Sequence, residues 1–448
     1  MYETDTIAAI ATPPGRGALG VVRLSGVGAV DVARRMFVLA GKKAWRVRSH
    51  YMEYGTIMHE GQTVDEVMLC AMLAPRSFTR EDVVEIYAHG GALSLQGVLD
   101  AALECGARLA RAGEFTRRAF LNGRINLSQA EAVMDIIHAG SEAARAAGLR
   151  QLGGGLTRRV GACRDAVLRW LAHISLSIDY PEHEEEAMNR TLILAEGRQV
   201  LADMDALLAT AEVGRRVREG IQTAIVGAPN AGKSTLLNAL LGQDRALVHE
   251  LPGTTRDILT EQVQIGGLAL VLMDTAGLRE TTDAVEQMGV ARSQAAAQAA
   301  ALVLHVVDAS AETQPVWEAA DNQQVITVWN KCDLVADAPS GGVAVSAKTG
   351  QGLTDLIDAI RAACLDASAM TQEDFGRVDV LTRVRHKELL AEARAFLSHA
   401  LSEFAAGVAE DMVAISLRGA YLSLGHILGE EYADDIVDRI FAEFCVGK

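Results

Sequence analysis

Residues 227–234 read Gly227-Ala228-Pro229-Asn230-Ala231-Gly232-Lys233-Ser234. This G-x-x-x-x-G-K-S spacing is typical of a phosphate-binding loop, in which glycines let backbone N–H groups turn toward phosphate oxygens. Lys233 supplies a charge for the β- and γ-phosphates, and the Ser234 hydroxyl can ligate Mg²⁺. An apolar run at 221–226 precedes the loop and an amphipathic run at 235–241 follows it. This order predicts a strand, the loop and a helix, as in an α/β nucleotide-binding domain.

Three later motifs extend the predicted nucleotide site. Asp274-Thr275-Ala276-Gly277 follows the apolar run 268–273, where an Asp can hold Mg²⁺ through water and a Gly can bring an N–H to the γ-phosphate. Asn330-Lys331-Cys332-Asp333 follows the run 325–329, and Ser346-Ala347-Lys348 follows 343–345. The Asp333 carboxylate can accept two hydrogen bonds from guanine, a donor pair that adenine lacks. Because ligands of open α/β sheets bind at the carboxyl ends of the strands, these motifs together predict a GTP site.

Hydrolysis needs further groups. Gly253-Thr254-Thr255-Arg256-Asp257 lies between the phosphate loop and Asp274, and we expect Thr255 to close on Mg²⁺ when the γ-phosphate is present. Leu278 stands where Ras-like GTPases carry the Gln that orients water, so another polar side chain must act. The following stretch offers three carboxylates, and the residues alone leave the choice open: Glu280, Asp283 and Glu286.

Composition sets the outer limits. The 448 residues suffice for about three domains of roughly 100–200 residues, and half of them are hydrophobic, so large cores can form. No apolar run reaches the ~18 residues of a spanning helix. The acidic start Met1-Tyr2-Glu3 is unlike a signal peptide, and the six cysteines form no C-x-x-C pair, which favours a cytoplasmic protein with reduced thiols. The net charge of −16 disfavours broad nonspecific binding of nucleic acid.

Pattern changes along the chain predict a multidomain protein. We expect an α+β N-terminal domain, a discontinuous all-α helical domain and an inserted α/β P-loop GTPase domain. Ser128 and Glu131 have the spacing of a capping box, which predicts the start of a helix, and Gly153-Gly154-Gly155 and Tyr180-Pro181 predict breaks. The predicted boundaries are 1–122 for the N-terminal domain, 123–215 and 371–448 for the two helical parts, and 216–370 for the GTPase domain.

Several stretches carry a resemblance to one family. They are Asn230 in the phosphate loop, the run 253–257, Asp274 to Glu280, the chain end Phe444-Cys445-Val446-Gly447-Lys448, and the N-terminal stretches 12–17 and 113–116. Among the translation-factor-related GTPases, the chain resembles the bacterial tRNA-modification GTPases called MnmE or TrmE, and the resemblance extends over its whole length.

The resemblance implies roles in the GTPase domain. Glu286 would orient the attacking water, with Lys233 and Thr255 also in the catalytic set. A K⁺ ion would take the place of an arginine finger, held by Asn230, by the carbonyls of His249 and Leu251, and at Thr254. Mg²⁺ would be held by Ser234 and Thr255. The full predicted nucleotide-binding set is Asn230, Ala231, Gly232, Lys233, Ser234, Thr235, His249, Glu250, Leu251, Pro252, Gly253, Thr254, Thr255, Asp274, Thr275, Ala276, Gly277, Asn330, Lys331, Asp333, Ser346, Ala347 and Lys348.

The resemblance also implies that 1–122 binds folate and dimerises. The folate-contacting positions correspond to Arg23, Glu85 and Arg124, with Lys448 nearby. The residues alone favour ordinary surface ion pairs, so folate binding rests on the resemblance. Cys445 lies beside an apolar helical stripe and fits either a packed thiol or a part in the modification chemistry. The implied cofactors are GTP, Mg²⁺, K⁺ and a tetrahydrofolate derivative in the 5-formyl or 5,10-methylene form.

Two classes of function remain open at this point. The resemblance implies a GTPase that, as a homodimer joined by the FAD-dependent partner MnmG in a heterotetramer, adds a (carboxymethyl)aminomethyl group to C5 of the wobble uridine of tRNA. The alternative is a regulatory or ribosome-assembly GTPase switch without modification chemistry. RNA-binding relatives of that second type usually carry a recognisable module such as a KH domain, and no such module is evident in the C-terminal region.

Overall fold

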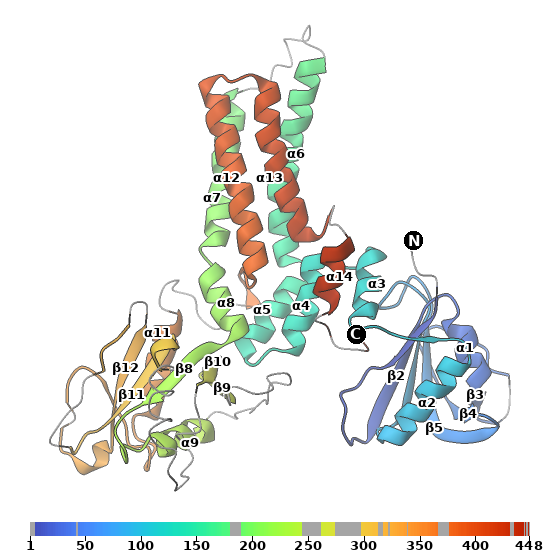
Figure 1. Ribbon diagram of the computed structural model, residues 1–448, viewed down its shortest axis with the longest axis horizontal. Coiled ribbons are helices and arrows are strands. Elements are labelled where there is room, and N and C mark those ends of the chain that lie inside the picture. Colours follow the sequence, from blue (N-terminus) through green and yellow to red (C-terminus); the bar gives the residue numbers. More distant parts are fainter. Residues whose placement is uncertain are drawn as a thin grey trace. The chain divides into compact units, whose positions relative to one another are not determined.

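The structure is a computed structural model that describes residues 5–41, 44–179, 190–243, 261–273, 297–311, 317–320, 323–337, 339–365, 376–430, 434–442, 444 and 447. Its contacts divide the chain into two compact units, drawn in Figure 1. Unit 1 combines residues 1–130 with 428–448, and unit 2 comprises residues 131–427. The last stretch of the chain therefore packs with its beginning.

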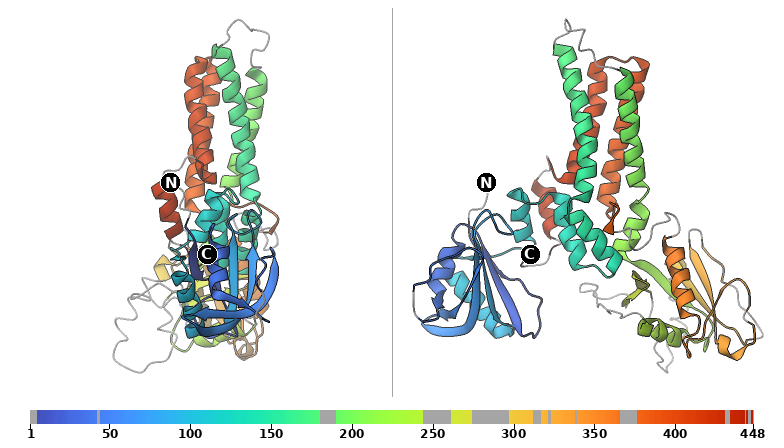
Figure 2. Two further views of the ribbon diagram at one scale, coloured as in Figure 1. Left: turned by 90° about the vertical axis from the view of Figure 1, so that its right-hand side faces the viewer. Right: turned by 180° about the vertical axis from the view of Figure 1, so that it is seen from behind.

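Unit 1 is built on a mixed sheet with the strand order β3-β4-β5-β6-β2-β1-β7. The β1–β7 pair is parallel and the other pairs are antiparallel. Alternate residues such as Val22 and Leu24 face α1 and α2 and form the main core with Val98 of α2; Figure 2 shows both helices against the sheet. The elements are β1 (Ile7–Ile10), β2 (Leu19–Ser25), α1 (Ala29–Met36), β3 (Phe37–Leu39), β4 (Tyr51–His59), β5 (Gln62–Met72), β6 (Val83–His89), α2 (Ala92–Glu104) and β7 (Arg108–Leu109).

The opposite face of β1 carries a second, smaller core. Ile7 and Ala9 pack there with Phe115 of α3 (Glu114–Leu121) and with Phe78. The C-terminal helix α14 (Asp434–Ala442) lies against α3, and the ring of Phe441 lies 6.1 Å from that of Phe120. Gly113 has φ +66, and a Cβ there would lie 2.5 Å from the Phe441 carbonyl oxygen, so this close approach requires glycine.

Helix α4 (Leu127–Ile137) begins differently from the sequence prediction. Asn126 accepts a hydrogen bond from the Gln129 backbone N–H through Oδ1 (2.9 Å), and Gln129 Oε1 accepts one from the Asn126 N–H (3.0 Å). The reciprocal capping box is therefore Asn126 with Gln129, and the predicted pair of Ser128 and Glu131 is wrong by two residues. Ser128 instead donates to Asn126 Oδ1, and Glu131 is buried inside unit 2.

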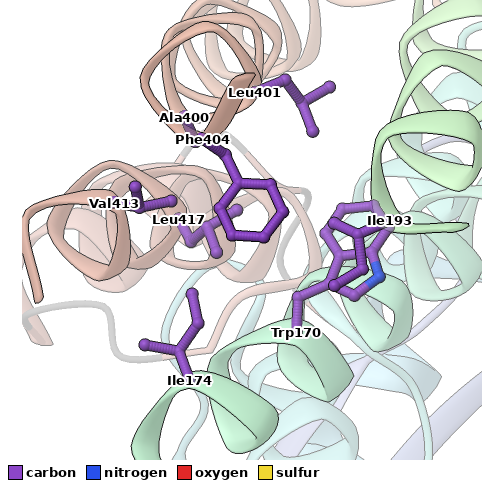
Figure 3. A pocket seen from close by; sticks show the side chains of 8 residues that line it. All are labelled: Trp170, Ile174, Ile193, Ala400, Leu401, Phe404, Val413 and Leu417. Atoms are coloured by element: carbon purple, nitrogen blue, oxygen red, sulfur yellow. The ribbon is translucent and has the colours of Figure 1, made fainter. Parts of the chain in front are cut away.

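Among the described residues of unit 2, the long helices α6 (Gly155–Asp179), α7 (Arg190–Leu208), α12 (Val384–Ala406) and α13 (Glu410–Leu428) run side by side, as Figures 1 and 2 show. The predicted break at 153–155 is confirmed, because α5 ends at Leu152 and α6 starts at Gly155, whereas the predicted break at 180–181 lies outside the described residues. Figure 3 shows a small apolar cavity among α6, α7, α12 and α13, lined by Trp170, Phe404 and Leu417. The helices are α5 (Glu142–Leu152), α6 (Gly155–Asp179), α7 (Arg190–Leu208), α8 (Ala211–Glu219), α12 (Val384–Ala406) and α13 (Glu410–Leu428).

Between α8 and α12 the chain forms an α/β sheet with the order β13-β12-β11-β8-β10-β9. The β9–β10 hairpin is antiparallel, with its turn at Gly266 and Gly267, and the other pairs are parallel. This agrees with the expected P-loop architecture and with the hairpin expected there. The elements are β8 (Ile221–Val226), α9 (Lys233–Gln243), β9 (Glu261–Ile265), β10 (Leu268–Leu272), β11 (Leu302–Asp308), β12 (Gln324–Asn330), the 3-10 turn η3 (Cys332–Leu334), β13 (Val343–Ala344) and α11 (Leu353–Leu365).

A buried ion network joins this sheet's flanking segments to α4. Asp135 accepts hydrogen bonds from Arg218, at the end of α8, and from Arg383, just before α12, at 3.0 and 2.6 Å. One turn earlier, Glu131 accepts from Arg385 and contacts His386, both at 2.8 Å. The segments that precede and follow the α/β sheet are thus fixed to one side of α4.

The multidomain character expected from the sequence is present in these parts: a mixed α+β sheet unit, a helical region and an α/β sheet. The exact boundaries at residues 122, 215 and 370 stay predictions.

Candidate functional site

The phosphate loop connects the carboxyl end of β8 to α9, and its backbone is sterically specialised. Asn230 has φ +63, a left-handed conformation that Asn tolerates, and Gly232 has φ +93. A Cβ on Gly232 would collide with the side-chain amide of Asn330, and one on Gly227 would collide with the Val306 carbonyl. The two motif glycines are therefore required by close neighbours as well as by dihedral angles.

Lys233 is the first residue of α9 and folds back over the loop. Its Nζ donates to the carbonyl oxygens of Gly227 and Ala228, both at 3.0 Å. Burial lowers the pKa of this amine. The charge is thus held at the mouth of the loop, beside the exposed residues Ser234 and Thr235 in the first turn of the helix. A helix N-terminus with a lysine at this position is suited to binding an anion such as a polyphosphate.

Asn330, at the end of β12, is 2% exposed and joins two loops. Its Nδ2 donates to the Ala231 carbonyl (2.8 Å), and its Oδ1 accepts from the Ala347 N–H (3.0 Å). Three of the predicted motifs are therefore brought together at the carboxyl edge of the sheet. The sequence motif places Asn330 in the nucleotide site but does not reveal this bridging contact.

The turn after β12 carries the residues predicted to contact the base. Lys331 has φ +63, and its Nζ donates to Asp308 Oδ2 at 2.6 Å. Burial raises the pKa of Asp308, but the hydrogen bonds from Lys331 and Ser310 outweigh this and hold it below its ordinary value. Asp333 lies exposed on η3, and no hydrogen bond or ion pair reaches its carboxylate within the part of the chain that the structure describes. A carboxylate in this state can accept donors from a ligand.

The Ser346–Lys348 segment follows β13 as predicted. Ser346 is fully buried, and its Oγ accepts from the Thr349 N–H at 3.2 Å, which closes a tight turn. Ala347 presents its N–H to Asn330, while Lys348 is exposed. Asp308 is the residue that the sequence analysis missed here. Its position directly after the largely apolar run 302–307, where a strand is expected to end, is a signal that could have found it.

Several predicted site residues lie outside the described residues, so the structure gives no account of them. They are His249, Glu250, Leu251, Pro252, Gly253, Thr254, Thr255, Asp274, Thr275, Ala276, Gly277, Glu286, Cys445 and Lys448.

A second candidate site lies on the sheet of unit 1. Arg23 on β2 and Glu85 on β6 are register partners, and Arg23 Nε and Nη2 contact Glu85 Oε1 at 2.9 and 2.8 Å. Tyr87 donates its hydroxyl proton to Glu85 Oε2 at 2.6 Å. Burial and this bond raise the pKa of Tyr87 to about 12, so it remains a donor at neutral pH. Arg23 Nη1 also donates to the Gly447 carbonyl (3.3 Å), which brings the chain end to this site.

Arg124 and Arg23 both lie against the ring of Phe78, and no contact of Arg124 with Glu85 is among those of the described residues. Arg124 Cζ lies 4.7 Å from the centre of the Phe78 ring, and Arg23 Cζ lies 5.8 Å from the same centre. Arg124 Nη1 also donates to the Phe78 carbonyl (3.1 Å). The three predicted folate residues are thus connected through Phe78, which the sequence analysis missed, as it missed Tyr87.

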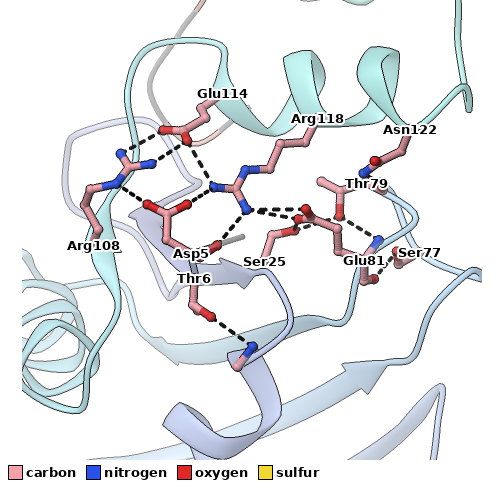
Figure 4. Close-up of polar contacts among 11 residues, drawn as sticks. Asp5, Thr6, Ser25, Ser77, Thr79, Glu81, Arg108, Glu114, Arg118 and Asn122 are labelled. Carbon is pink, nitrogen blue, oxygen red and sulfur yellow. Dashed lines mark hydrogen bonds and ion pairs between the residues drawn. The ribbon is translucent and has the colours of Figure 1, made fainter. Parts of the chain in front are cut away.

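A buried network fixes the loop that carries Phe78, as Figure 4 shows. Arg118 is 5% exposed and donates to Asp5, Glu81 and Glu114. Glu81 in turn accepts from Ser25 Oγ at 2.7 Å. Burial raises the pKa of Glu114, but the bonds from Arg108 outweigh this and hold it below its ordinary value, so Glu114 stays charged. The network links the residues before β1, the helix α3 and the loop 77–82.

Known proteins match the chain from end to end. A family model described as "MnmE helical domain" matches residues 127–445, and one described as "GTP-binding protein TrmE N-terminus" matches residues 6–124. The chain belongs to the MnmE family. Curated relatives named tRNA modification GTPase MnmE include that of Chloroflexus aurantiacus, 46% identical over 99% of this chain and 100% of its own length. That of Moorella thermoacetica is 44% identical over 99% of each chain, and that of Geobacillus kaustophilus 42% over 100% of each.

Membership of the MnmE family rests on these full-length matches. A crystal structure of an Aquifex aeolicus Era variant with GDP and aluminium fluoride is 29% identical over 31% of this chain and 55% of its own, with a TM-score of 0.22. Within the described residues, no helix has the length and apolar character to cross a membrane. In the same residues, no group of three or more His, Cys, Asp or Glu side chains is placed to hold a metal ion.

Proposed function

We propose that the chain hydrolyses GTP and that this activity serves the modification of C5 of the wobble uridine in tRNA. The single observation that carries the proposal is the phosphate loop braced by Asn330 against the Ala347 loop, in a chain that matches the MnmE family along its whole length. The relatives are named tRNA modification GTPases, and the braced loop is the part of such an enzyme that binds polyphosphate.

The proposed roles in the nucleotide site follow from residue chemistry. Lys233 Nζ would exchange the carbonyls of Gly227 and Ala228 for phosphate oxygens, and Asp333 would accept the paired donors of guanine. Ser234 is exposed at the start of α9 and fits a hydroxyl ligand of Mg²⁺, which when bound neutralises phosphate charge. Thr255 would be the second such ligand and Glu286 would orient water.

We further propose that K⁺ supplies the charge that an arginine finger provides elsewhere. Asn230 supports this, because its side chain is exposed at the top of the loop and an amide oxygen suits a hard cation. His249, Leu251 and Thr254 would complete the ligand set on the grounds of the family resemblance. GTP turnover should be markedly faster in K⁺ than in Na⁺, and Asn230→Ala should remove the difference. Equal rates in the two salts would reject the K⁺ site.

In unit 1 we propose a site for a tetrahydrofolate derivative, in the 5-formyl or 5,10-methylene form, as the source of the one-carbon unit. Glu85 has a fixed carboxylate that can accept heterocycle N–H groups, and Arg124 can bind the glutamate carboxylates. Lys448 and Cys445 would act near this site. Calorimetry with 5-formyltetrahydrofolate tests the proposal. If titration released no heat and no competition between reduced folates for the protein were seen, the proposed folate site would be rejected.

The remaining parts of the proposal concern partners. The chain would act in the cytoplasm as a homodimer joined through residues 1–122, with the FAD-dependent MnmG in a heterotetramer and with tRNA as substrate. Mass spectrometry of tRNA nucleosides from a strain without this protein decides the matter. Loss of the aminomethyl-type uridines supports modification, whereas unchanged nucleosides with defective ribosomes would show an assembly switch instead.

A further inference from the structure

Arg80 and Arg124 of unit 1 form a cationic pair without an acidic partner. Arg80 Nη1 donates to the Asn122 carbonyl (2.9 Å) and Arg124 Nη1 donates to the Phe78 carbonyl (3.1 Å), so backbone oxygens orient both groups. Burial, and then the charge of Arg80, lower the pKa of Arg124, as expected for two like charges held close together. In the described parts of the chain, no carboxylate lies within ion-pair distance of either arginine.

The neighbouring acids are committed elsewhere. Glu81 accepts from Arg118 at 3.2 Å and from Ser25 at 2.7 Å. Asp82 accepts from the Ala74 backbone N–H at 2.8 Å. Glu81 and Asp82 therefore do not neutralise the two arginines, whose charge can be matched by an anionic group of a ligand.

Hydrogen bonds fix the loop that carries Arg80 and connect it to the segment that carries Arg124. Asn122 Nδ2 donates to the Thr79 carbonyl (2.7 Å), and Thr79 Oγ1 contacts Ser25 Oγ (2.7 Å) deep in the network of Figure 4. Arg80 itself has φ +59, a conformation that a long side chain rarely adopts. The fold thus holds Arg80 in an unfavourable backbone conformation beside a second positive charge, which is typical of functional positions rather than of stabilising ones.

The pair continues the row of groups that begins at Glu85. Glu85 contacts Arg23, and Arg23 and Arg124 both lie against the Phe78 ring. Arg124 follows Asn122 by two residues, and the Asn122 carbonyl oxygen accepts a hydrogen bond from Arg80, which brings the second arginine to the same place. The row therefore has a hydrogen-bond acceptor at one end, an aromatic ring in the middle and two guanidinium groups at the other end. A ligand complementary to it has a donor-bearing heterocycle at one end and a chain of carboxylates at the other.

We propose that Arg124 binds the first glutamate of a glutamyl tail and Arg80 the carboxylates of the glutamates added to it, so that unit 1 takes polyglutamylated reduced folate in preference to the monoglutamate. The inference rests on the proposed folate site and specifies the form of folate that it uses. Each added glutamate brings a further carboxylate, and a guanidinium group can bind a carboxylate through two parallel hydrogen bonds. RNA phosphates offer similar chemistry, but Arg124 lies against the same Phe78 ring as Arg23 of the proposed folate site, which favours the tail.

Calorimetry on the full-length protein with 5-formyltetrahydrofolate carrying one or three glutamates tests this. The wild-type protein should bind the triglutamate about tenfold more tightly, the gain of one charge-assisted contact. Arg80→Gln should abolish that preference while changing monoglutamate affinity by less than roughly threefold, within the usual effect of an exposed substitution. Arg80→Lys, which keeps the charge but loses the planar fork, should retain part of the preference.

Arg76→Gln is the matched control, because it removes a charge from an exposed arginine of the same loop. It should leave the preference intact, and an equal loss in both variants would show general charge attraction and overturn the proposal. Equal affinity of the wild-type protein for the two folates would overturn it while leaving the folate site standing. Binding of neither folate would reject the site itself. An unchanged preference with weakened tRNA binding in Arg80→Gln would assign the pair to RNA.

Discussion

Replacing Asn330 with alanine should weaken GDP binding by about a hundredfold. The side chain is 2% exposed and satisfies both the Ala231 carbonyl and the Ala347 N–H. Its removal leaves two buried backbone groups without partners, at a cost of about 1–3 kcal/mol each. In the free variant the two loops will shift so that these backbone groups find other partners. Nucleotide binding must then return the loops to their wild-type positions, and the free energy of that change lowers the affinity. A net loss of about 3 kcal/mol corresponds to the stated factor.

Titration with a fluorescent GDP analogue measures this effect. Asn238→Ala is the matched control, since it removes the same amide from an exposed position on α9 and should change affinity by less than about 0.5 kcal/mol. A dissociation constant of Asn330→Ala within roughly threefold of the wild-type value would refute the bracing role, because a factor of three is below the cost of even one unsatisfied buried group.

Three further changes test other parts of the structure. Gly232→Ala should abolish nucleotide binding in the same titration, because its Cβ collides with Asn330, whereas Gly242→Ala, where a Cβ meets nothing within 4 Å, should not. Glu131→Gln should destabilise unit 2 by about 3–5 kcal/mol in urea unfolding at pH 7, since it removes the buried carboxylate that contacts Arg385 and His386. Burial raises the pKa of Glu131, but His386 and Arg385 outweigh this and hold it far below 4.5. The stabilisation is therefore present above pH 4.5, and the difference in stability between wild type and variant should shrink as the pH falls further. A constant difference down to pH 3 would contradict this pH dependence. Phe78→Leu should lower 5-formyltetrahydrofolate affinity about tenfold by calorimetry, because two arginines each lose a ring contact of about 0.5–1 kcal/mol, and Phe78→Tyr should restore it.

The sequence predicted the strand, phosphate loop and helix well, because local spacing determines their geometry. The phosphate loop requires its glycines and lysine at fixed intervals, so a single stretch reveals it. The bridging role of Asn330 was not predictable in this way, because it depends on the loops after β8, β12 and β13 meeting at one edge of the sheet. Motif order indicated that edge but not which atoms touch across it.

Other misses have equally specific causes. The capping box was predicted at Ser128 because Ser128 and Glu131 have the S-x-x-E spacing. Asn126 and Gln129 have the same spacing with an amide at each position, and they form the reciprocal hydrogen bonds of the capping box in the structure. Tyr87 was detectable, since it lies two residues from Glu85 on a strand and so shares its face. Phe78 carried no such signal, because it lies in a loop without periodicity and its role depends on arginines from distant segments.

Asp135 accepts hydrogen bonds from both Arg218 and Arg383, which has a consequence for protein engineering. Both ends of the inserted sheet segment lie within one side chain's reach of the same carboxylate, so the gap left by excising residues 219–382 is short. A brief flexible linker can close it with both arginines still in place. The helical region and unit 1 could then be produced without the GTPase segment, which would allow folate and tRNA binding to be measured in the absence of any nucleotide response.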